Sequence, residues 1–211
     1  YTERVARLRK RACAILYPQW KKEYNIYTDK NIRNEGYKVN FISDLHFGTT
    51  MSNNELQKYC DNISQRNVDI VILGGDIVDE NTTLKQMKDA FKILSSIKSN
   101  YGIVYVYGNH DKSRYAINPN YTEEELKEAI SECRIKILED DIYEINNELC
   151  IIGRKDRSDS EERKSAQDLV SEFNKDYYTI IVDHQPCEIN ENSENGYDLM
   201  VSGHTHFGQI W

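Results

Sequence analysis

The sequence contains little proline or glycine, few cysteines and no long apolar run. With 3 prolines and 10 glycines among 211 residues, it cannot be collagen-like or a Pro/Gly-rich disordered chain. Nothing approaches the ~18 consecutive apolar residues of a membrane-spanning helix, so we expect no span and no signal peptide within these residues. Its 39% hydrophobic and 29% charged residues are typical of one soluble globular domain.

The cysteines are too few and too scattered for a disulfide framework. They are odd in number, and no two of them form a Cys-x-x-Cys pair, so a zinc-thiolate site or a redox thiol protein is also disfavoured. The pattern favours a reducing compartment and ordinary buried or half-buried thiols. The five positions are Cys13, Cys60, Cys133, Cys150 and Cys187.

Positive charge is in deficit. The chain has 27 Lys and Arg against 35 Asp and Glu, for a net charge of -8. Because nucleic-acid binding depends on neutralising phosphates, we expect no stable nucleic-acid binding by such a chain. Phosphate chemistry would require imported positive charge, such as metal ions.

The first residues carry a helical spacing of apolar side chains with basic residues between them, and Pro18 marks an end. We predict a basic amphipathic helix there. It either lies on the domain with its charges in water or is a cytoplasmic juxtamembrane segment, since Lys and Arg cluster on the cytoplasmic side of spans. Because the chain opens on Tyr1 and stops at Trp211, we expect it to be part of a longer protein.

Short apolar runs alternate with helical patterns, which is typical of an α/β domain. Several of the runs are continuous, as expected for strands covered on both faces. We predict strands at residues 38–43, 69–73, 103–107, 149–152, 179–182 and 198–201, with strand and hairpin structure over 135–147. We predict helices at residues 54–66, 83–97, 122–133 and 161–173, the third opened by a capping box of Thr122 and Glu125.

Metal-ligating side chains follow five of these strands. Because the carboxyl ends of parallel strands share one edge of a sheet, these side chains can converge on one crevice. Each turn alone has an ordinary explanation, such as a capping carboxylate, a left-handed turn or a half-buried imidazole. Five such coincidences at one edge are much harder to accept, so we predict a shared metal site. The turns are Asp44-Leu45-His46, Gly74-Gly75-Asp76-Ile77-Val78-Asp79, Gly108-Asn109-His110-Asp111, Asp183-His184-Gln185-Pro186 and Gly203-His204-Thr205-His206.

The donor set suits more than one transition-metal ion. Carboxylates (Asp44, Asp76), an amide oxygen (Asn109) and four imidazoles favour Mn, Fe, Zn or Co over Ca. These ligands are too many for one ion. Two ions that share one carboxylate can lie about 3.5–4 Å apart and act on both oxygens of a displacement at phosphorus. Asp76 lies in the middle of the set, so we expect its carboxylate to be the one that the two ions share.

The ordered series Asp-x-His, Gly-Asp-x-x-Asp, Gly-Asn-His-Asp, His-x-Pro and Gly-His-Thr-His resembles the calcineurin-like metallophosphoesterase superfamily over residues 39–209. The ending is similar to a bacterial branch often tethered to membranes. The resemblance implies a four-layer α/β/β/α sandwich with residues 1–36 as a lead-in and 37–211 as the catalytic domain. It also implies that Asp44, His46 and His206 hold one ion and that Asn109, His184 and His204 hold the other, with Asp76 between them.

The resemblance further implies roles at the third turn. His110 would stabilise phosphoryl charge or protonate the leaving oxygen. Asp111 would orient a nearby imidazole or be a surface turn carboxylate. The role of Asp79, in the second turn, is left undecided between the same alternatives.

We therefore expect a phosphoester hydrolase with two divalent ions, most favourably Mn, that attacks in line with a bridging hydroxide. The substrate would be a diester, a pyrophosphate or a monoester, and a lipid-linked one if the start is juxtamembrane. The expected location is the cytoplasm or the inner face of the membrane. The competing prediction is a non-catalytic scaffold module of the same fold. The oligomeric state is not predicted.

Overall fold

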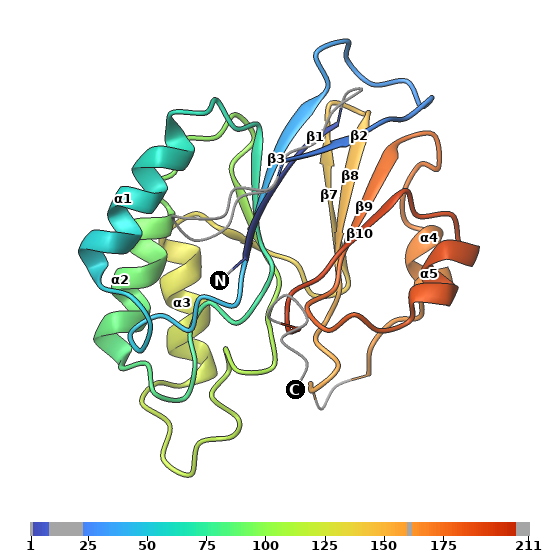
Figure 1. Cartoon of the computed structure of the whole chain (residues 1–211). Helices are drawn as coiled ribbons and strands as arrows, with labels where there is room; N and C mark the ends of the chain where they lie inside the picture. The colour runs from blue at the N-terminus through green and yellow to red at the C-terminus, as the bar shows by residue number, and fades with distance from the viewer. Residues whose placement is uncertain (1, 9–22, 160–161, 206–211) are drawn as a thin grey trace.

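The computed structural model describes residues 2–8, 23–159 and 162–205, which build two β-sheets packed face to face between helices (Figure 1). The first sheet has the strand order β2-β1-β3-β4-β5-β6 and the second has the order β10-β9-β8-β7. The first contains β1 (Thr2–Leu8), β2 (Glu23–Ile26), β3 (Tyr37–Ser43), β4 (Ile70–Leu73), β5 (Ile103–Tyr105) and β6 (Lys136–Ile137). The second contains β7 (Asp141–Ile145), β8 (Leu149–Gly153), β9 (Tyr178–Val182) and β10 (Leu199–Val201).

Strands β3 to β6 are parallel to one another, and so are β8 to β10. Strand β1 pairs antiparallel with β3, and β7 pairs antiparallel with β8. Parallel neighbours bring the ends of their strands to a common edge, which is where those predicted ligands that the structure describes lie.

The helices cover the outer faces of both sheets. Helices α1 (Asn53–Ser64), α2 (Leu84–Leu94) and α3 (Glu123–Glu132) lie on the first sheet, and α4 (Ala166–Val170) and α5 (Ile189–Glu194) lie on the second (Figure 1). A capping box opens each of the first four helices, and the one of Thr122 and Glu125 was predicted. Among the described residues, no helix combines the length and the apolar character needed to cross a membrane.

The core follows from the alternation of side chains along the strands. Ile70 and Ile72 face the second sheet and pack in the layer between the sheets, whereas Val71 and Leu73 face helices α1 to α3. A smaller cluster joins Ile152 and Ile181 of the second sheet to Leu169 of α4. This arrangement confirms the predicted four-layer α/β/β/α sandwich.

The six predicted strands between residues 38 and 201 are confirmed, with ends that differ by one or two residues. Residues 135–147 do contain strands, β6 and β7, but these lie in different sheets, and the hairpin is the one that β7 forms with β8. Of the four described cysteines, two are buried and two are half-buried, and all four are in the thiol form. Cys13 lies outside the described residues.

The predicted N-terminal helix is wrong for Thr2–Leu8, which form strand β1. An edge of β3 would otherwise leave its backbone N–H and C=O groups unpaired, and β1 pairs with it along seven residues. The remainder of that predicted helix lies outside the described residues. Strand β2 and the short helix α5 were not predicted.

The predicted helix over residues 161–173 is also too long, because α4 spans only Ala166–Val170. Residues before it are held by other contacts. The Arg163 guanidinium is paired with Asp183, and the Lys164 backbone N–H donates to Asp140 at 2.8 Å. Ser165 then caps the helix through its side chain, so the helix begins after it.

Candidate metal centre

The turns that follow β3, β4, β5, β9 and β10 meet at one edge of the two sheets. The backbone N–H of His46 donates to the Asp76 carbonyl at 3.0 Å, which ties the first turn to the second. The N–H of His204 donates to Asp44 Oδ1 at 2.8 Å, and that of His110 donates to Asp76 Oδ1 at 2.9 Å. Residues far apart in sequence are therefore joined through the carboxylates predicted as ligands.

Two groups of metal-ligating side chains occur there, and Asp76 belongs to both. The ligand atoms of Asp44, His46 and Asp76 all lie within 4.8 Å of one another, and so do those of Asp76, His184 and His204. Asp76 is 1% exposed, so its carboxylate lies well below the surface. The predicted ligand His206 lies outside the described residues.

The backbone at these turns adopts an uncommon conformation. Four of the ligand residues have positive φ: Asp44 at 57°, His46 at 43°, Asp76 at 52° and His204 at 65°. Non-glycine residues in this region cost of order 1–3 kcal/mol each, and such strain gathers at functional sites. Gly108 is required for a related reason, because a Cβ there would lie 2.2 Å from Asp76 Oδ1.

His184 supplies the test of whether a metal ion fits. Its Nδ1 lies 2.8 Å from the Gly74 carbonyl, which can only accept, so Nδ1 carries the hydrogen. In the neutral ring Nε2 is then a lone pair, and it lies 3.0 Å from Asp76 Oδ2 with no hydrogen-bond partner among the described residues. Two buried electron-rich atoms that face each other need a proton or a metal cation beside them, and a divalent ion coordinated by both atoms would meet that need when the proton is absent.

His46 is held in the same manner from the other side of Asp76. Its Nδ1 lies 3.2 Å from Asp79 Oδ2, and its Nε2 lies 3.8 Å from Asp76 Oδ2. A carboxylate behind an imidazole fixes the ring and turns the other nitrogen toward the metal. This gives Asp79, left open by the sequence, a position behind a ligand.

His204 and Asn109 complete the described set. His204 Nδ1 lies 2.9 Å from Asn109 Oδ1, and the His204 ring lies edge-on to the His184 ring at 5.4 Å. Asn109 is 7% exposed and its amide oxygen points at the same cluster.

His110 lies beside the cluster rather than in either ligand group. Its ring is 5.5 Å from the His46 ring, and its side chain is 35% exposed, so it borders solvent. Its Nδ1 lies 3.0 Å from Glu80 Oε2. The sequence analysis missed Glu80, although its place directly after Gly-Asp-Ile-Val-Asp was a signal that could have found it.

Asp111 occupies a different place from the one predicted. Its carboxylate is 0% exposed and accepts backbone N–H groups of Asp76 at 2.7 Å, Ile77 at 2.8 Å, Val78 at 3.1 Å and Gly108 at 2.6 Å. The described contacts therefore join it to the turn that bears Asp76, not to an imidazole. Asp111 is a positioning residue, since it acts on the metal centre through that backbone.

The electrostatics of the centre favour bound positive charge. Burial by itself lowers the pKa of His184, but the carboxylates of Asp76 and Asp44 outweigh it and raise that pKa to about 10. Burial likewise raises the pKa of Asp76, yet the His184 imidazole and the His110 backbone N–H reverse the effect and lower it. Without metal, the centre thus holds a proton that a divalent ion can replace.

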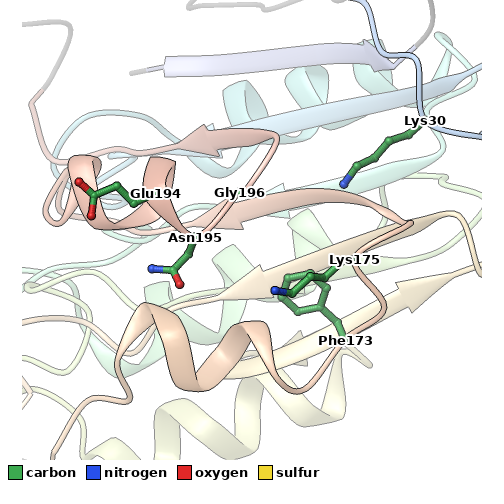
Figure 2. Close-up of a pocket in the computed structure, with 6 residues that line it drawn as sticks. All are labelled: Lys30, Phe173, Lys175, Glu194, Asn195 and Gly196. Carbon is green, nitrogen blue, oxygen red and sulfur yellow. The ribbon is translucent and has the colours of Figure 1, made fainter.

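A separate pocket of about 260 Å³ lies at the other ends of β9 and β10 (Figure 2). The Lys30 ammonium group on the wall of this pocket is already paired, because its Nζ contacts Asp198 Oδ2 at 2.8 Å and the Tyr177 carbonyl oxygen at 2.7 Å. No metal-ligating histidine lines it, so it has no part in the metal centre. The lining residues are Lys30, Phe173, Lys175, Glu194, Asn195 and Gly196.

Comparison with known proteins gives relatives over most of the chain. An uncharacterized metallophosphoesterase of Helicobacter pylori is 30% identical over 194 residues, which are 90% of this chain and 49% of the relative. One of Aquifex aeolicus is 29% identical over 90% of this chain and 70% of its own length. A Danio rerio protein named "Transmembrane protein with metallophosphoesterase domain" is 26% identical over 83% of this chain and 41% of its own.

The chain thus spans about half the length of the first of these relatives. A crystal structure covering 79% of this chain and 83% of its own superposes with a TM-score of 0.55 at 11% identity, which supports the fold. The sequence pattern of the calcineurin-like phosphoesterases matches residues 37–208. The chain therefore belongs to the calcineurin-like phosphoesterase family, whose members are hydrolases that use divalent metal ions on phosphoester bonds.

Proposed function

We propose that this chain hydrolyses phosphoesters with two divalent metal ions that share Asp76. The observation that carries the proposal is the pair of ligand groups with Asp76 in common. Asp44, His46 and His206 would hold one ion, and Asn109, His184 and His204 the other. Divalent ions bound there supply Lewis acidity, which makes water acidic enough to act as the nucleophile near neutral pH.

The surrounding residues prepare the centre for this chemistry. Gly74 and Asp79 fix the ring orientations of His184 and His46, so no ligand has to reorient. Asp111 holds the backbone on both sides of Asp76. His110, oriented by Glu80 and open to solvent, donates a proton to the leaving oxygen or stabilises phosphoryl charge.

The substrate we propose is a phosphodiester or pyrophosphate, with a monoester as the weaker candidate. The His110 side chain is 35% exposed and His204 is exposed, so the edge of the sheets that carries the metal centre borders solvent. An open rim accommodates a substituent on each side of the phosphate. Manganese is the ion that we favour, because carboxylate, amide and imidazole donors all suit it.

We also propose that the protein acts at the inner face of a membrane or in the cytoplasm on a lipid-linked phosphate. Support comes from relatives such as the one in Danio rerio, whose name places a metallophosphoesterase domain in a transmembrane protein.

The competing function is a metal-binding scaffold without catalysis. Hydrolysis of bis-p-nitrophenyl phosphate with manganese distinguishes the two. We expect turnover that disappears on chelation and returns when manganese is restored. A chain that binds manganese and leaves the diester intact would support the scaffold, and Asp176→Asn, at an exposed carboxylate, serves as the matched control for variants of the centre.

A panel of mono-, di- and pyrophosphate esters then separates the substrate classes. We expect kcat/KM to be highest for a diester or a pyrophosphate. A preference for the monoester would contradict the open-rim argument while leaving the hydrolytic assignment intact.

A further inference from the structure

An exposed aromatic ring lies directly against His110. Tyr115 is 60% exposed, and its ring centroid is 5.3 Å from that of His110 at an interplanar angle of 57°. Two residues later Ile117 is 96% exposed. Single exposed apolar residues are ordinary on protein surfaces. The contact of Tyr115 with an imidazole at the edge of the metal centre is what distinguishes it.

The loop that carries Tyr115 is held firmly at its start. Lys112 Nζ is within 2.9 Å of three carboxylates and 4.5 Å from the centre of the Tyr107 ring, although the Lys112 side chain is only 6% exposed. Buried charges paired in this way are costly to displace. The three carboxylates belong to Glu123, Glu139 and Asp159.

A second set of contacts holds the loop from its other side. Arg114, next to Tyr115, pairs with Asp159 at 3.0 Å and donates to the Ser158 carbonyl at 3.1 Å. The Tyr121 hydroxyl donates to the Asp111 carbonyl at 2.9 Å. The backbone around Tyr115 is therefore anchored, and its ring is presented to solvent from a fixed position.

We propose that Tyr115 is a specificity-determining residue that packs against an apolar group on the leaving oxygen of the substrate. The inference rests on the proposed function, in which His110 serves the leaving oxygen. A substituent on that oxygen has to extend past the His110 imidazole, and the Tyr115 ring is the apolar surface next to it. The exposed Tyr115 ring is covered when such a substrate binds, so the contact buries apolar area in the complex.

The expected size of the effect follows from the chemistry of ring contacts. A well-formed aromatic contact changes affinity by roughly twofold to tenfold beyond simple burial. The phenol oxygen has no part in this role. Tyr115→Phe should therefore behave as the unaltered chain, and Tyr115→Ala should not.

The test uses phosphonates, which bind without being hydrolysed. Dissociation constants of phenyl-, hexyl- and methylphosphonate are measured by calorimetry on the manganese-loaded chain and its variants. We expect Tyr115→Ala to weaken phenylphosphonate by about threefold to tenfold and methylphosphonate by less than twofold. Tyr27→Ala is the matched control, because Tyr27 is 63% exposed and precedes β3, at the far end of that strand from the metal centre.

The hexyl arm identifies the kind of contact. If Tyr115→Ala weakens the binding of both phenyl- and hexylphosphonate, Tyr115 makes a general apolar contact. If it weakens the binding of phenylphosphonate alone, the contact is ring packing. Equal weakening of all three ligands, or of none, would overturn the role of Tyr115.

Diester turnover separates this inference from the proposed function. With bis-p-nitrophenyl phosphate, Tyr115→Ala should raise KM with little change in kcat. If the chain turns over the diester but Tyr115→Ala prefers phenylphosphonate over methylphosphonate as strongly as Tyr27→Ala does, only the role of Tyr115 is refuted. A chain that binds phosphonates selectively but hydrolyses nothing refutes the proposed function alone, and one that neither binds a phosphonate nor hydrolyses the diester refutes both.

Discussion

Asp111→Asn is the perturbation whose consequence can be worked out most directly from the structure. Oδ2 accepts the N–H groups of Asp76 and Gly108, and Oδ1 accepts those of Ile77 and Val78. In the variant an amide NH₂ replaces one oxygen. Two backbone N–H groups then lose their acceptor and face a donor instead.

Each buried donor left without a partner costs about 1–3 kcal/mol, so Asp111→Asn should lower the free energy of unfolding by about 2–6 kcal/mol. That is a large fraction of the about 5–15 kcal/mol that stabilises a typical domain. Urea unfolding followed by circular dichroism measures it. Manganese affinity should fall as well, because the backbone of Asp76 is among the groups released.

The control is Asp176→Asn, the same change at an exposed carboxylate, which should alter stability by less than about 0.5 kcal/mol. If Asp111→Asn lowered the free energy of unfolding by less than about 1 kcal/mol, the four backbone hydrogen bonds to Asp111 would contribute little to stability. The assignment of Asp111 as a positioning residue would then have to be abandoned.

Changes within the metal centre should separate metal binding from turnover. Asp76→Asn should reduce manganese content measured by elemental analysis, and full occupancy would count against its shared role. His110→Ala should reduce diester turnover by about 100-fold or more with metal content unchanged, and equal loss of both would contradict its place outside the ligand groups. Glu80→Gln should reduce kcat by about tenfold through His110, and an unchanged kcat would show that Glu80 does not orient that ring. Because the pKa of His184 is raised from 6.5 to about 10, its protonation stabilises the metal-free protein fully below pH 6.5. That stability should be lost as the pH rises toward 10, and manganese should abolish the dependence. Thermal unfolding of chelated and loaded protein checks this, and a flat profile without metal would refute it.

Much of the fold followed from the sequence because apolar runs and turn residues are local signals. The run Ile70 to Leu73 reads as a strand buried on both faces, and the polar turn after it carries Asp76. The convergence of the turns then follows from parallel strands, which share an edge. Thr122 with Glu125 likewise fixed the start of α3 from four residues of sequence.

The failures have a common physical origin in tertiary contacts. Residues 2–8 fit a helical spacing, but pairing with the open edge of β3 outweighs that preference. Residues 162–165 are withheld from α4 by the contacts of Arg163 and Lys164. A local sequence pattern contains neither the edge of β3 nor the carboxylates that hold Arg163 and Lys164.

The supporting residues of the metal centre were harder to predict than its ligands. Asp79, Glu80 and Asp111 are all carboxylates in turns, and nothing in their spacing says which imidazole or amide each one faces. In the folded chain Asp79 faces His46, Glu80 faces His110, and Asp111 accepts backbone N–H groups of the turn that bears Asp76. These depend on how two turns pack, which is a property of the folded chain.

Metal stoichiometry measured together with diester turnover tests the central claim most directly. Metal-free chain is titrated with manganese, and bound metal and hydrolysis of bis-p-nitrophenyl phosphate are followed in the same samples. The account predicts two ions per chain, with turnover that rises as the second one binds. Full turnover with one ion or none, or two bound ions without any turnover, would contradict it.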